Sequence, residues 1–589
     1  MPQITIDGNL LNVDSGKTVI EAAYQNNMQI PHFCWHPELS VSGNCRMCLV
    51  EVGMPKRLPD GSTEHDSDGN QIVQWFPKLQ IACATQVTDG MIVRTQNEKV
   101  IEAQESVMEF LLINHPLDCP ICDEAGECKL QEYAFLHSNG ESRFTEAKNH
   151  KEKRQSWGPN VIFDAERCIS CSRCIRYSKE IANQDVLTFV NRGDHVTIEL
   201  FEGTELDNPY SMNVIELCPV GALTSKDFRF KSRVWEMSFN PSICPGCSRG
   251  CNMEIGVKNN KVLRLQPDNN QFVNKYWMCD YGRLTQYNSI NDERITSNLV
   301  RKSGELTQVE FDEAKIAAVE ALNRFKHSEI MVLGSPFSTN EDHYILNKFT
   351  RKVLKTNHID FIKRFDADFA DNSLRTSEKS PNTKGATLMG IQPLGDSFSS
   401  NQLIELINKK AIKALLIVND NLEGNSELLD AARNLELLIT ISPNNNSFTA
   451  ISDIVFAASS YAEIEGTFTN VEERVQLLSP ALVTKENIHR MGMKMSRWDK
   501  FGSFNDHWTQ KEIRDCKPVW KIIKALGNSM GGNFDYTSSE DIFNEISNQI
   551  PDFNGMNYAL LKENKGIKLN AANKKEKVTM NYVSHSFKP

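Results

Sequence analysis

Residues 167–181 read RCISCSRCIRYSKEI and place Cys168, Cys171 and Cys174 within seven residues. A fourth cysteine, Cys218, stands directly before a proline in the segment ELCPVGAL at 216–223. Thiolates two residues apart can turn toward one iron–sulfur core, and a remote Cys-Pro can complete the ligand set. Because this region has only one such run and one Cys-Pro, we expect a single [4Fe–4S] cluster here.

A second cluster site is predicted just upstream, where a helical pattern ends. Residues 98–113 carry apolar side chains at helical spacing, and Pro116 forbids continuation of that helix. The next segment, HPLDCPICDEAGEC, supplies one imidazole and three thiolates from His115, Cys119, Cys122 and Cys128. This set suits a second [4Fe–4S] cluster. A neutral histidine removes one negative charge from the ligands and should favour the reduced state.

The N-terminal region carries the signals of a small sheet with cysteines in its loops. Residues 3–13 alternate as two short strands around the turn Asp7-Gly8, and a helical stretch follows from Thr18 to Asn27. The opening resembles a β-grasp ferredoxin, which implies a [2Fe–2S] cluster. Its first gap is ten residues, wider than the four of plant-type ferredoxins. The ligands implied are Cys34, Cys45, Cys48 and Cys83. The polar stretch at 53–76 has no hydrophobic period, and we interpret it as a surface insertion.

A fourth set of cysteines begins the second half of the chain. Its spacing is C-x2-C-x3-C-x27-C, and its members are Cys244, Cys247, Cys251 and Cys279. The arrangement resembles the cluster domain that opens molybdopterin oxidoreductases, which implies a third [4Fe–4S] cluster. From about residue 300, helical and strand-like segments alternate, which predicts parallel α/β layering. The segment AEIEGTFTNVEERVQ at 462–476 resembles the closing signature of a molybdopterin-type core.

The distribution of cysteines separates metal ligation from disulfide bonding. Fifteen of the sixteen cysteines lie between Cys34 and Cys279, and the chain begins without a secretory signal. A reducing compartment keeps thiols free for metals. Structural zinc remains the alternative for any single set, because C-x2-C pairs also bind zinc. The seven-residue run, the proline after Cys218 and the succession of four sets favour iron–sulfur clusters.

The remaining candidate residues receive structural interpretations. Cys516 lies far from the other cysteines, and we expect it to be a small buried side chain. His32, His36 and His65 lack the context of a ligand, and we expect surface or packing roles for them.

Bulk composition excludes several classes of protein. The 589 residues predict several domains, and no apolar run approaches the roughly 20 residues of a membrane-spanning helix. The net charge of −11 comes without a long acidic tail or a basic stripe, which argues against nucleic acid as a partner. The chain has neither G-x-G-x-x-G nor a P-loop, so NAD and FMN are expected to bind elsewhere.

The order of the four cluster motifs resembles the large iron–sulfur subunit of bacterial respiratory NADH:quinone oxidoreductase (complex I). The fold class implied is multidomain α+β and α/β, with a β-grasp ferredoxin, ferredoxin-like domains and a truncated molybdopterin-oxidoreductase-like region without molybdopterin. The expected modules are 1–97 (β-grasp [2Fe–2S]), 98–138 (one histidine and three cysteines), 139–233 (ferredoxin-like), 234–295 (molybdopterin-type cluster), 296–490 (degenerate α/β domain) and 491–589 (C-terminal extension of unknown role).

The resemblance also implies a function and partners. Electrons from NADH and flavin on a neighbouring subunit would enter at the Cys34 set, pass to the Cys168 set and then to the His115 set. The Cys244 set would lie off this route and be structural. The implied partners are the flavin/NADH-binding subunit, the small [2Fe–2S] subunit and the ferredoxin-like [4Fe–4S] subunit of a quinone-reducing translocase. The location implied is the cytoplasmic face of the bacterial inner membrane, with membrane contact through partners only.

Two related enzyme classes share the same front end. An NAD-linked formate dehydrogenase needs a cysteine or selenocysteine ligand to molybdenum after the fourth cluster, but no cysteine occurs between 280 and 515. An iron-only hydrogenase needs further cysteine motifs in its C-terminal domain, and these are also absent. The alternative that remains is an electron-transfer subunit on the diaphorase side of a formate dehydrogenase or hydrogenase complex.

Overall fold

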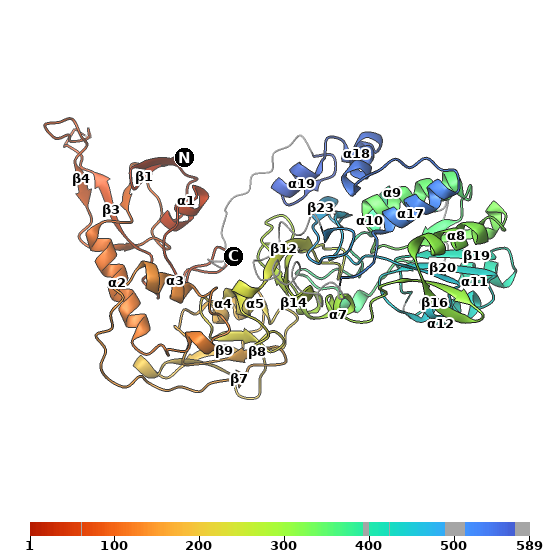
Figure 1. Ribbon diagram of the computed structural model, residues 1–589. Helices are drawn as coiled ribbons and strands as arrows, with labels where there is room; N and C mark the ends of the chain where they lie inside the picture. Colours follow the sequence, from red (N-terminus) through yellow and green to blue (C-terminus); the bar gives the residue numbers. More distant parts are fainter. Residues whose placement is uncertain (61, 393–399, 423, 489–512, 572–589) are drawn as a thin grey trace. The chain divides into compact units, whose positions relative to one another are not determined.

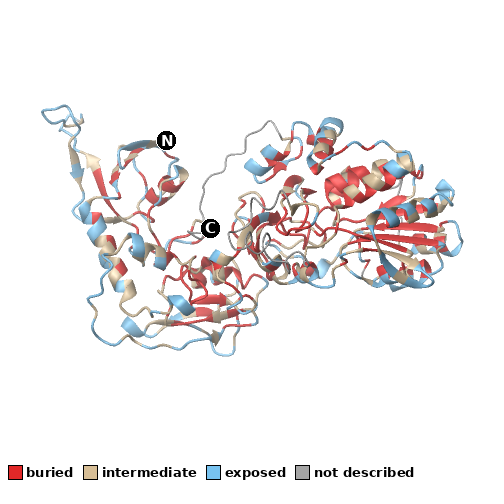
Figure 2. Ribbon diagram, in the orientation of Figure 1, coloured by how far each residue is buried: buried red, intermediate tan, exposed pale blue. Residues whose placement is uncertain are grey.

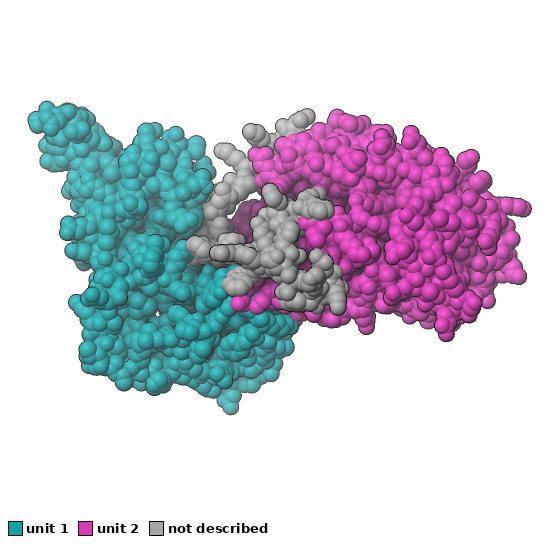
Figure 3. All heavy atoms as spheres, viewed as in Figure 1, with its two compact units in different colours: residues 1–235, 577–589 teal, residues 236–576 magenta. Residues whose placement is uncertain are grey.

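The computed structural model describes residues 1–60, 62–392, 400–422, 424–488 and 513–571. The chain divides into two compact units at Trp235/Glu236 (Figure 3). Among the helices of these described ranges, none combines the length and apolar character needed to cross a bilayer. The first three cysteine sets belong to the first unit and the fourth belongs to the second.

The first unit begins with a mixed sheet that carries the Cys34 set in its loops. The strand order is β2-β1-β6-β3-β4, and β5 pairs with β3. The strands are β1 Gln3–Ile6, β2 Asn9–Asn12, β3 Leu49–Pro55, β4 Val73–Trp75, β5 Gln80–Ile81 and β6 Ile92–Arg94. Helix α1 (Val19–Gln25) begins at Thr18, which forms a capping box with Glu21. The two short strands and the helix expected before Asn27 are confirmed.

The polar stretch after Met54 is exposed, as expected, but it is ordered as an extension of a hairpin. Strands β3 and β4 pair from Gly53–Trp75 to Pro55–Val73. Isolated bridges then join Arg57 to Thr63 and His65 to Gln71 beyond the ends of these strands. Beyond the β3–β4 pairing the backbone therefore forms two short bridged turns, which lie past the β4 label in Figure 1. A hairpin with polar side chains on both faces lacks the alternating pattern that would reveal it in the sequence.

Short elements around the next two cysteine sets complete the first unit. Helix α2 (Glu98–Leu112) begins at Asn97, whose side chain accepts from the Val100 amide, and ends where the sequence predicted. Further helices are the 3-10 turns η1 Cys119–Ile121 and η2 Gly193–His195, and α3 Lys129–Leu136, α4 Arg173–Glu180 and α5 Asn213–Leu217. The strands form a sheet β11-β8-β7 and a hairpin β9-β10; they are β7 Gln155–Ser156, β8 Val161–Phe163, β9 Leu187–Val190, β10 Thr197–Leu200 and β11 Leu223–Ser225.

The second unit opens with a three-stranded antiparallel sheet around the fourth cysteine set. Its strands are β12 Ser238–Ile243, β13 Asn252–Lys258 and β14 Lys261–Pro267. The ladder between β13 and β14 shifts register at Gly256/Val257. Helix α6 (Asp280–Thr285) follows and begins at Cys279. Cys244, Cys247 and Cys251 therefore lie in the connection between β12 and β13, and Cys279 lies between β14 and α6.

A seven-stranded sheet forms the core of the second unit, in the order β16-β15-β21-β20-β19-β17-β18. Its strands are β15 Asn298–Lys302, β16 Glu305–Val309, β17 Ile330–Gly334, β18 Ile359–Phe361, β19 Ala414–Val418, β20 Leu437–Ser442 and β21 Ile454–Ala457. The five strands from β17 to β21 pair in parallel. They are buried on both faces, as their near-continuous apolar runs require (Figure 2). The predicted parallel α/β layering is confirmed.

Helices cover both faces of this sheet. One face packs against residues of α8 (Phe311–Leu322), α9 (Asn340–Lys348) and α17 (Val519–Ser529). The opposite face packs against α11 (Ser400–Asn408) and α12 (Ser426–Ala432). Alternate strand residues separate accordingly, because Val332 and Leu416 face the first group while Met331 and Leu415 face the second.

The C-terminal segment differs from the expected separate extension. Its described residues, 513–571, contribute α17, α18 (Ser539–Gln549) and α19 (Tyr558–Glu563) to the same hydrophobic core as the sheet. Strand β24 (Ile567–Lys568) also pairs with β23 (Arg474–Leu478). The expected boundary at 490 is therefore wrong for this part. The remainder of the expected extension, 491–512 and 572–589, lies outside the described residues.

The GTFT part of the 462–476 signature forms strand β22 (Gly466–Thr469) and meets a buried carboxylate on α9. Glu341 accepts hydrogen bonds from the Thr467 amide at 2.8 Å, the Thr467 hydroxyl at 2.9 Å and the Tyr558 hydroxyl at 2.8 Å. Burial raises the pKa of Glu341 to about 7, although these donors pull it downward. The folded unit therefore favours the protonated form.

We expect this carboxylate to make the second unit less stable as pH rises. Its pKa is raised from 4.5 to about 7 on folding, so between these pH values the folded state binds more protons than the unfolded state. The free energy of unfolding therefore falls by roughly 3 kcal/mol as the pH rises through this interval. Glu341→Gln should remove this slope, whatever constant offset the amide adds. Unfolding free energies of both proteins at pH values on either side of this window provide the measurement. Equal pH dependence of the two proteins would contradict the assignment.

Candidate iron–sulfur cluster sites

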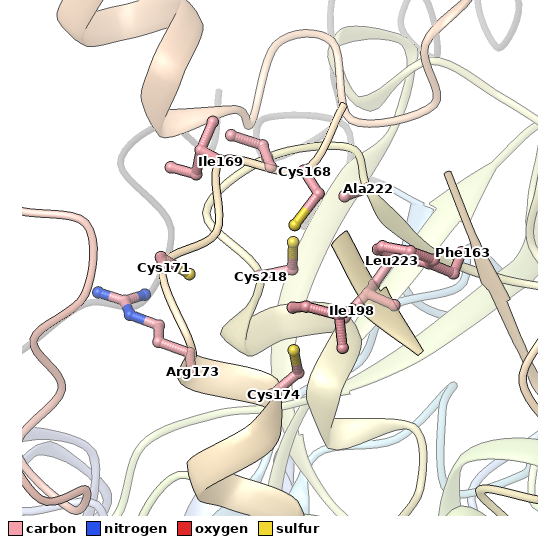
Figure 4. Close-up of a pocket in the computed structure, with 11 residues that line it drawn as sticks. Phe163, Cys168, Ile169, Cys171, Arg173, Cys174, Ile198, Cys218, Ala222 and Leu223 are labelled. Atoms are coloured by element: carbon pink, nitrogen blue, oxygen red, sulfur yellow. The ribbon is translucent and has the colours of Figure 1, made fainter. Parts of the chain in front are cut away.

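The Cys168 set converges on one cavity, which Figure 4 shows with its sulfur atoms. Ser170 and Ser172 have positive φ angles of 54° and 63°, and these left-handed residues coil the loop so that its cysteines face the same side. Cys218 arrives from the end of α5, and the apolar side chains of Phe163, Ile198 and Leu223 line the remainder of the cavity. All four predicted ligands are brought together here.

The chemistry of this cavity fits a cluster with thiolate ligands. Burial, and to a lesser degree the neighbouring Cys171, raises the pKa of Cys168 to about 12. The pKa values of Cys174 and Cys218 also lie well above 9, and burial is the main cause. Such thiols stay neutral in an empty apolar cavity, whereas iron deprotonates them on binding. A [4Fe–4S] cluster requires four soft ligands in a site that excludes water, and four thiolates in an apolar cavity meet this requirement.

The Cys34 set forms a chain of thiols within the N-terminal sheet. Cys34 is hydrogen-bonded to Cys45 and Cys83, and Cys83 also contacts Cys48. These bonds hold the pKa of Cys34 far below its usual range and raise that of Cys83, because one sulfur carries the negative charge that its neighbours stabilise. The Leu49–Ile81 pair of β3 and β5 brings Cys83 toward Cys48. Cys83 therefore joins the other three predicted ligands.

The His115 set is the least enclosed. Cys119 is exposed, whereas Cys122 is buried and Cys128 is partly buried. Turn η1 places Cys119 and Cys122 in one loop, and the Cys122 amide donates to the Cys119 carbonyl at 3.3 Å. A Cβ on Gly221 would lie 2.2 Å from the Cys122 sulfur, so a glycine is needed for this close approach.

His115 has the protonation state that a metal ligand needs. Burial, together with the charges of Arg167 and Lys148, lowers its pKa to about 4. The imidazole is therefore neutral at physiological pH, with a lone pair available for iron. Cys122 interacts electrostatically with both Cys119 and Cys128, and Arg167 acts on Cys122 as it does on His115. The donor set fits a cluster with mixed imidazole and thiolate ligands.

The Cys244 set is buried in the second unit. The Gly246 amide donates to the Cys244 sulfur at 3.4 Å, and the Gly282 amide donates to the Cys279 sulfur at 3.4 Å. A Cβ on Gly282 would lie 3.0 Å from the Cys244 sulfur and 3.6 Å from that of Cys279, so this glycine separates the two ligands. Cys247 and Cys251 act electrostatically on the same pair. The four predicted ligands surround one buried position.

Family comparisons follow the same division of the chain. Residues 2–98 match a 2Fe-2S iron-sulfur cluster binding domain, and residues 104–143 match the NADH-ubiquinone oxidoreductase-G iron-sulfur binding region. Residues 158–224 match the ferredoxin-like domain of NADH-quinone oxidoreductase subunit 3. The second half matches the molybdopterin oxidoreductase Fe4S4 domain at 237–289 and molybdopterin oxidoreductase at 382–499. Each of the four cysteine sets therefore falls inside one matched iron–sulfur domain.

Curated relatives carry one kind of name. NADH-quinone oxidoreductase subunit 3 of Thermus thermophilus is 36% identical over 61% of this chain and 47% of its own length. The G-type subunit of the NADH-quinone oxidoreductase of Rickettsia conorii is 34% identical over 67% of this chain and 54% of its own length. The G-type subunit of Streptomyces coelicolor is 38% identical over 62% and 42%. Over 61–67% of its own length the chain is similar to these G-type and subunit 3 proteins. It spans about half the length of the curated relatives it matches.

A solved structure of another enzyme is also similar in part to this chain. One chain of a crystal structure of NAD+-reducing [NiFe]-hydrogenase in the H2-reduced state is 25% identical and covers 40% of this chain and 91% of that one. The TM-score of 0.31 is too low for the superposition to carry an argument about the fold.

The structure also places the histidines and the cysteine that lie outside the four sets. His32 and His36 are buried and His65 is exposed, so the first two pack inside the unit. Cys516 is buried as expected, but its neighbours include the polar Ser459 and Glu463 besides apolar residues. None of these residues joins a cluster site. Among the described residues, no group of three or more His, Cys, Asp or Glu side chains forms a site for a single metal ion.

Two arginines that follow ligand cysteines join the Cys34 set to the Cys168 set, and the sequence reasoning missed them. Arg173 is buried and donates to the carbonyls of Trp35, at 2.5 Å, and Leu217, at 3.1 Å. Arg176 donates to the carbonyls of Cys34 and Ser40. Both arginines act electrostatically on Cys171, and Cys34 acts on it as well. An arginine beside a cysteine motif gave no sign of this role, because its partners lie more than a hundred positions away.

We expect His115→Cys to retain a cluster and to lower its reduction potential. A fourth thiolate adds one negative charge beside the iron, which disfavours the added electron. An EPR-monitored redox titration of the full complex measures the shift, and the signals of the other clusters serve as internal references. A potential unchanged by this substitution would contradict the assignment of His115 as a ligand.

Proposed function

We propose that the chain is the electron-transfer subunit of an NADH:quinone oxidoreductase and holds one [2Fe–2S] and three [4Fe–4S] clusters. The proposed ligands of the [2Fe–2S] cluster are Cys34, Cys45, Cys48 and Cys83. Those of the [4Fe–4S] clusters are His115, Cys119, Cys122 and Cys128; Cys168, Cys171, Cys174 and Cys218; and Cys244, Cys247, Cys251 and Cys279. The bound clusters supply reversible one-electron storage. The chain spans only part of its relatives' length, so the activity of the whole complex is inferred from the similarity to these relatives.

The observation that best supports electron transfer is the direct junction between the Cys34 and Cys168 sets. Hydrogen bonds from several residues join the Cys34–Cys45 loop to the segment at 170–180. Asn44 donates to the Ser170 carbonyl at 3.0 Å, and Ser172 donates to the Ser42 hydroxyl at 3.1 Å. Arg176 binds the Cys34 carbonyl and Arg173 binds that of Trp35. Ligands of two clusters held by one hydrogen-bonded junction keep a constant separation, which a relay of electrons needs.

The protein's own residues would keep the sites dry and the ligands oriented. Phe163, Ile198 and Leu223 exclude water beside the Cys168 set. Gly221 and Gly282 admit the sulfurs of Cys122 and Cys244 to close approach. The neutral His115 imidazole needs no proton release to bind iron. These features fit clusters that transfer electrons and bind no substrate.

Partners and location complete the proposal. The flavin/NADH-binding subunit would deliver electrons, and a ferredoxin-like [4Fe–4S] subunit on the quinone side would receive them, with a small [2Fe–2S] subunit nearby. The Cys244 cluster would be structural. The complex would be a translocase, with this chain peripheral on the cytoplasmic face of a bacterial inner membrane. The proposed modules keep the boundaries expected from the sequence up to residue 295, and the described residues beyond form one α/β module.

A second candidate is the equivalent subunit on the diaphorase side of a formate dehydrogenase or hydrogenase complex. Quantification of iron and acid-labile sulfide, with low-temperature EPR of the reduced protein, tests the proposed clusters directly. The expected result is one [2Fe–2S] and three [4Fe–4S] signals per chain. A protein without visible charge-transfer absorbance or iron would overturn the proposal, and quinone-linked NADH oxidation by the purified complex separates the two candidates.

A further inference from the structure

Arg167 stands directly before the ligand Cys168, but its side chain reaches the neighbouring His115 set. The side chain is only 5% exposed. Its Nε and Nη2 atoms donate to one oxygen of Asp118, at 3.2 and 2.9 Å, and Nε lies 3.5 Å from Asp164. Asp118 directly precedes Cys119. Arg167 therefore connects the loop of the Cys168 set to the loop of the His115 set.

One donor group of this guanidinium is unused. The Nη1 atom is buried and has no hydrogen-bond partner among the described residues. A buried N–H group without a partner costs about 1–3 kcal/mol, so such groups are rare in folded proteins. The other nitrogens are held by carboxylates, which fixes the direction of the plane. The Nη1 group of Arg167 is thus a charged donor in a fixed position, and no acceptor for it lies in the described part of the chain.

The positive charge of Arg167 acts on two of the proposed ligands, His115 and Cys122. It is the largest influence on His115 after burial, and the same holds for Cys122. Other charged groups face this region as well. Lys148 also acts on His115, and Lys153 shares Asp118 with Arg167 at 2.8 Å. The carboxylates of Asp118 and Asp164 oppose these cations.

We propose that Arg167 sets the reduction potential of the cluster held by His115, Cys119, Cys122 and Cys128, through its positive charge and its donor group without a partner among the described residues. The inference rests on the proposed function, because it requires a cluster at this site. Reduction adds one electron and makes the site more negative. A nearby cation and an N–H donor to sulfur both stabilise that state and raise the potential. Arg167 is therefore a positioning and tuning residue, distinct from the ligands.

Arg167→Gln in the assembled complex provides the main test, with an EPR-monitored redox titration as the readout. At a fixed ambient potential, the ratio of reduced to oxidised cluster should fall about tenfold, which is a shift of about 59 mV for a one-electron couple. Arg143→Gln is the matched control. It removes the same charge from an arginine that is 77% exposed and paired with Glu109, and it should leave the titration unchanged.

Asp118→Asn supplies a test of opposite sign. It removes the carboxylate that offsets the Arg167 charge, so the potential of the same cluster should rise. This second variant covers the case in which Arg167→Gln fails to assemble. A potential that stays the same or falls in Asp118→Asn, or one that matches the control in Arg167→Gln, overturns the inference. Absence of the cluster signal from the unsubstituted protein would instead overturn the proposed function.

Discussion

Cys171→Ala is expected to abolish electron flow from NADH to quinone in the assembled complex. Cys171 is buried and is one of the four cysteines that line the cavity of the Cys168 set. Loss of one thiolate leaves three ligands for a cluster that requires four, and alanine offers no replacement. Reduction of ferricyanide by NADH should continue, because the flavin is expected in a partner subunit. Both rates are measured on the same membranes or purified complex.

The matched control for this substitution is Cys516→Ala. Cys516 is also buried, but it lies outside every cysteine set, so its loss should leave both rates close to those of the unsubstituted complex. Low-temperature EPR should show that Cys171→Ala removes one [4Fe–4S] signal and that Cys516→Ala removes none. Quinone reduction that persists in Cys171→Ala would place the Cys168 set outside the electron route.

Arg173→Ala is expected to destabilise the first unit by about 3–5 kcal/mol. The substitution removes a fully buried side chain and leaves the carbonyls of Trp35 and Leu217 without this donor. It also opens a cavity where α4 meets the Cys34 loop. Chemical denaturation followed by visible circular dichroism reports mainly on the first unit, which holds three of the four proposed clusters, and its midpoint should shift to lower denaturant concentration.

Two comparisons sharpen this measurement. Arg143→Ala should change stability by less than about 0.5 kcal/mol, because the guanidinium of Arg143 is on the surface. The transition of the second unit, followed through its helical signal, should remain in place in both variants. A midpoint for Arg173→Ala equal to that of Arg143→Ala would show that the junction contributes no stability.

Cysteine spacing allowed most of the candidate sites to be predicted, because their ligands are close in the sequence. Cys168, Cys171 and Cys174 need only a local coil of the backbone to face one cavity. The remote ligands depend on tertiary structure. Cys83 reaches its set through the pairing of β3 with β5, and Cys218 reaches its set from the end of α5. The motifs predicted that Cys83 and Cys218 would lie beside their sets, and the structure places them there. The motifs did not predict which strand pairing or helix end brings them into place.

The features that the sequence did not reveal are those made by distant polar partners. Arg173 and Arg176 contact residues 138 and 142 positions away, and nothing in local spacing encodes such bonds. The hairpin after Met54 lacks alternating polarity because both of its faces meet solvent. The described residues 513–571 carry ordinary helical periods, so the sequence did not show that α17 packs on the sheet of the preceding region.

The junction between the Cys34 and Cys168 sets determines which of its residues can be substituted during evolution. Arg173 donates to the carbonyls of Trp35 and Leu217, and Arg176 donates to those of Cys34 and Ser40, so the bonds that these arginines make to the Cys34 loop have main-chain acceptors. Every residue presents a carbonyl, so substitutions at Trp35, Ser40 or Leu217 can alter side chains without deleting an acceptor. The two arginines have no such freedom. Selection is therefore expected to act unequally on the two sides of this junction, with strict retention of the donors and drift among the acceptors.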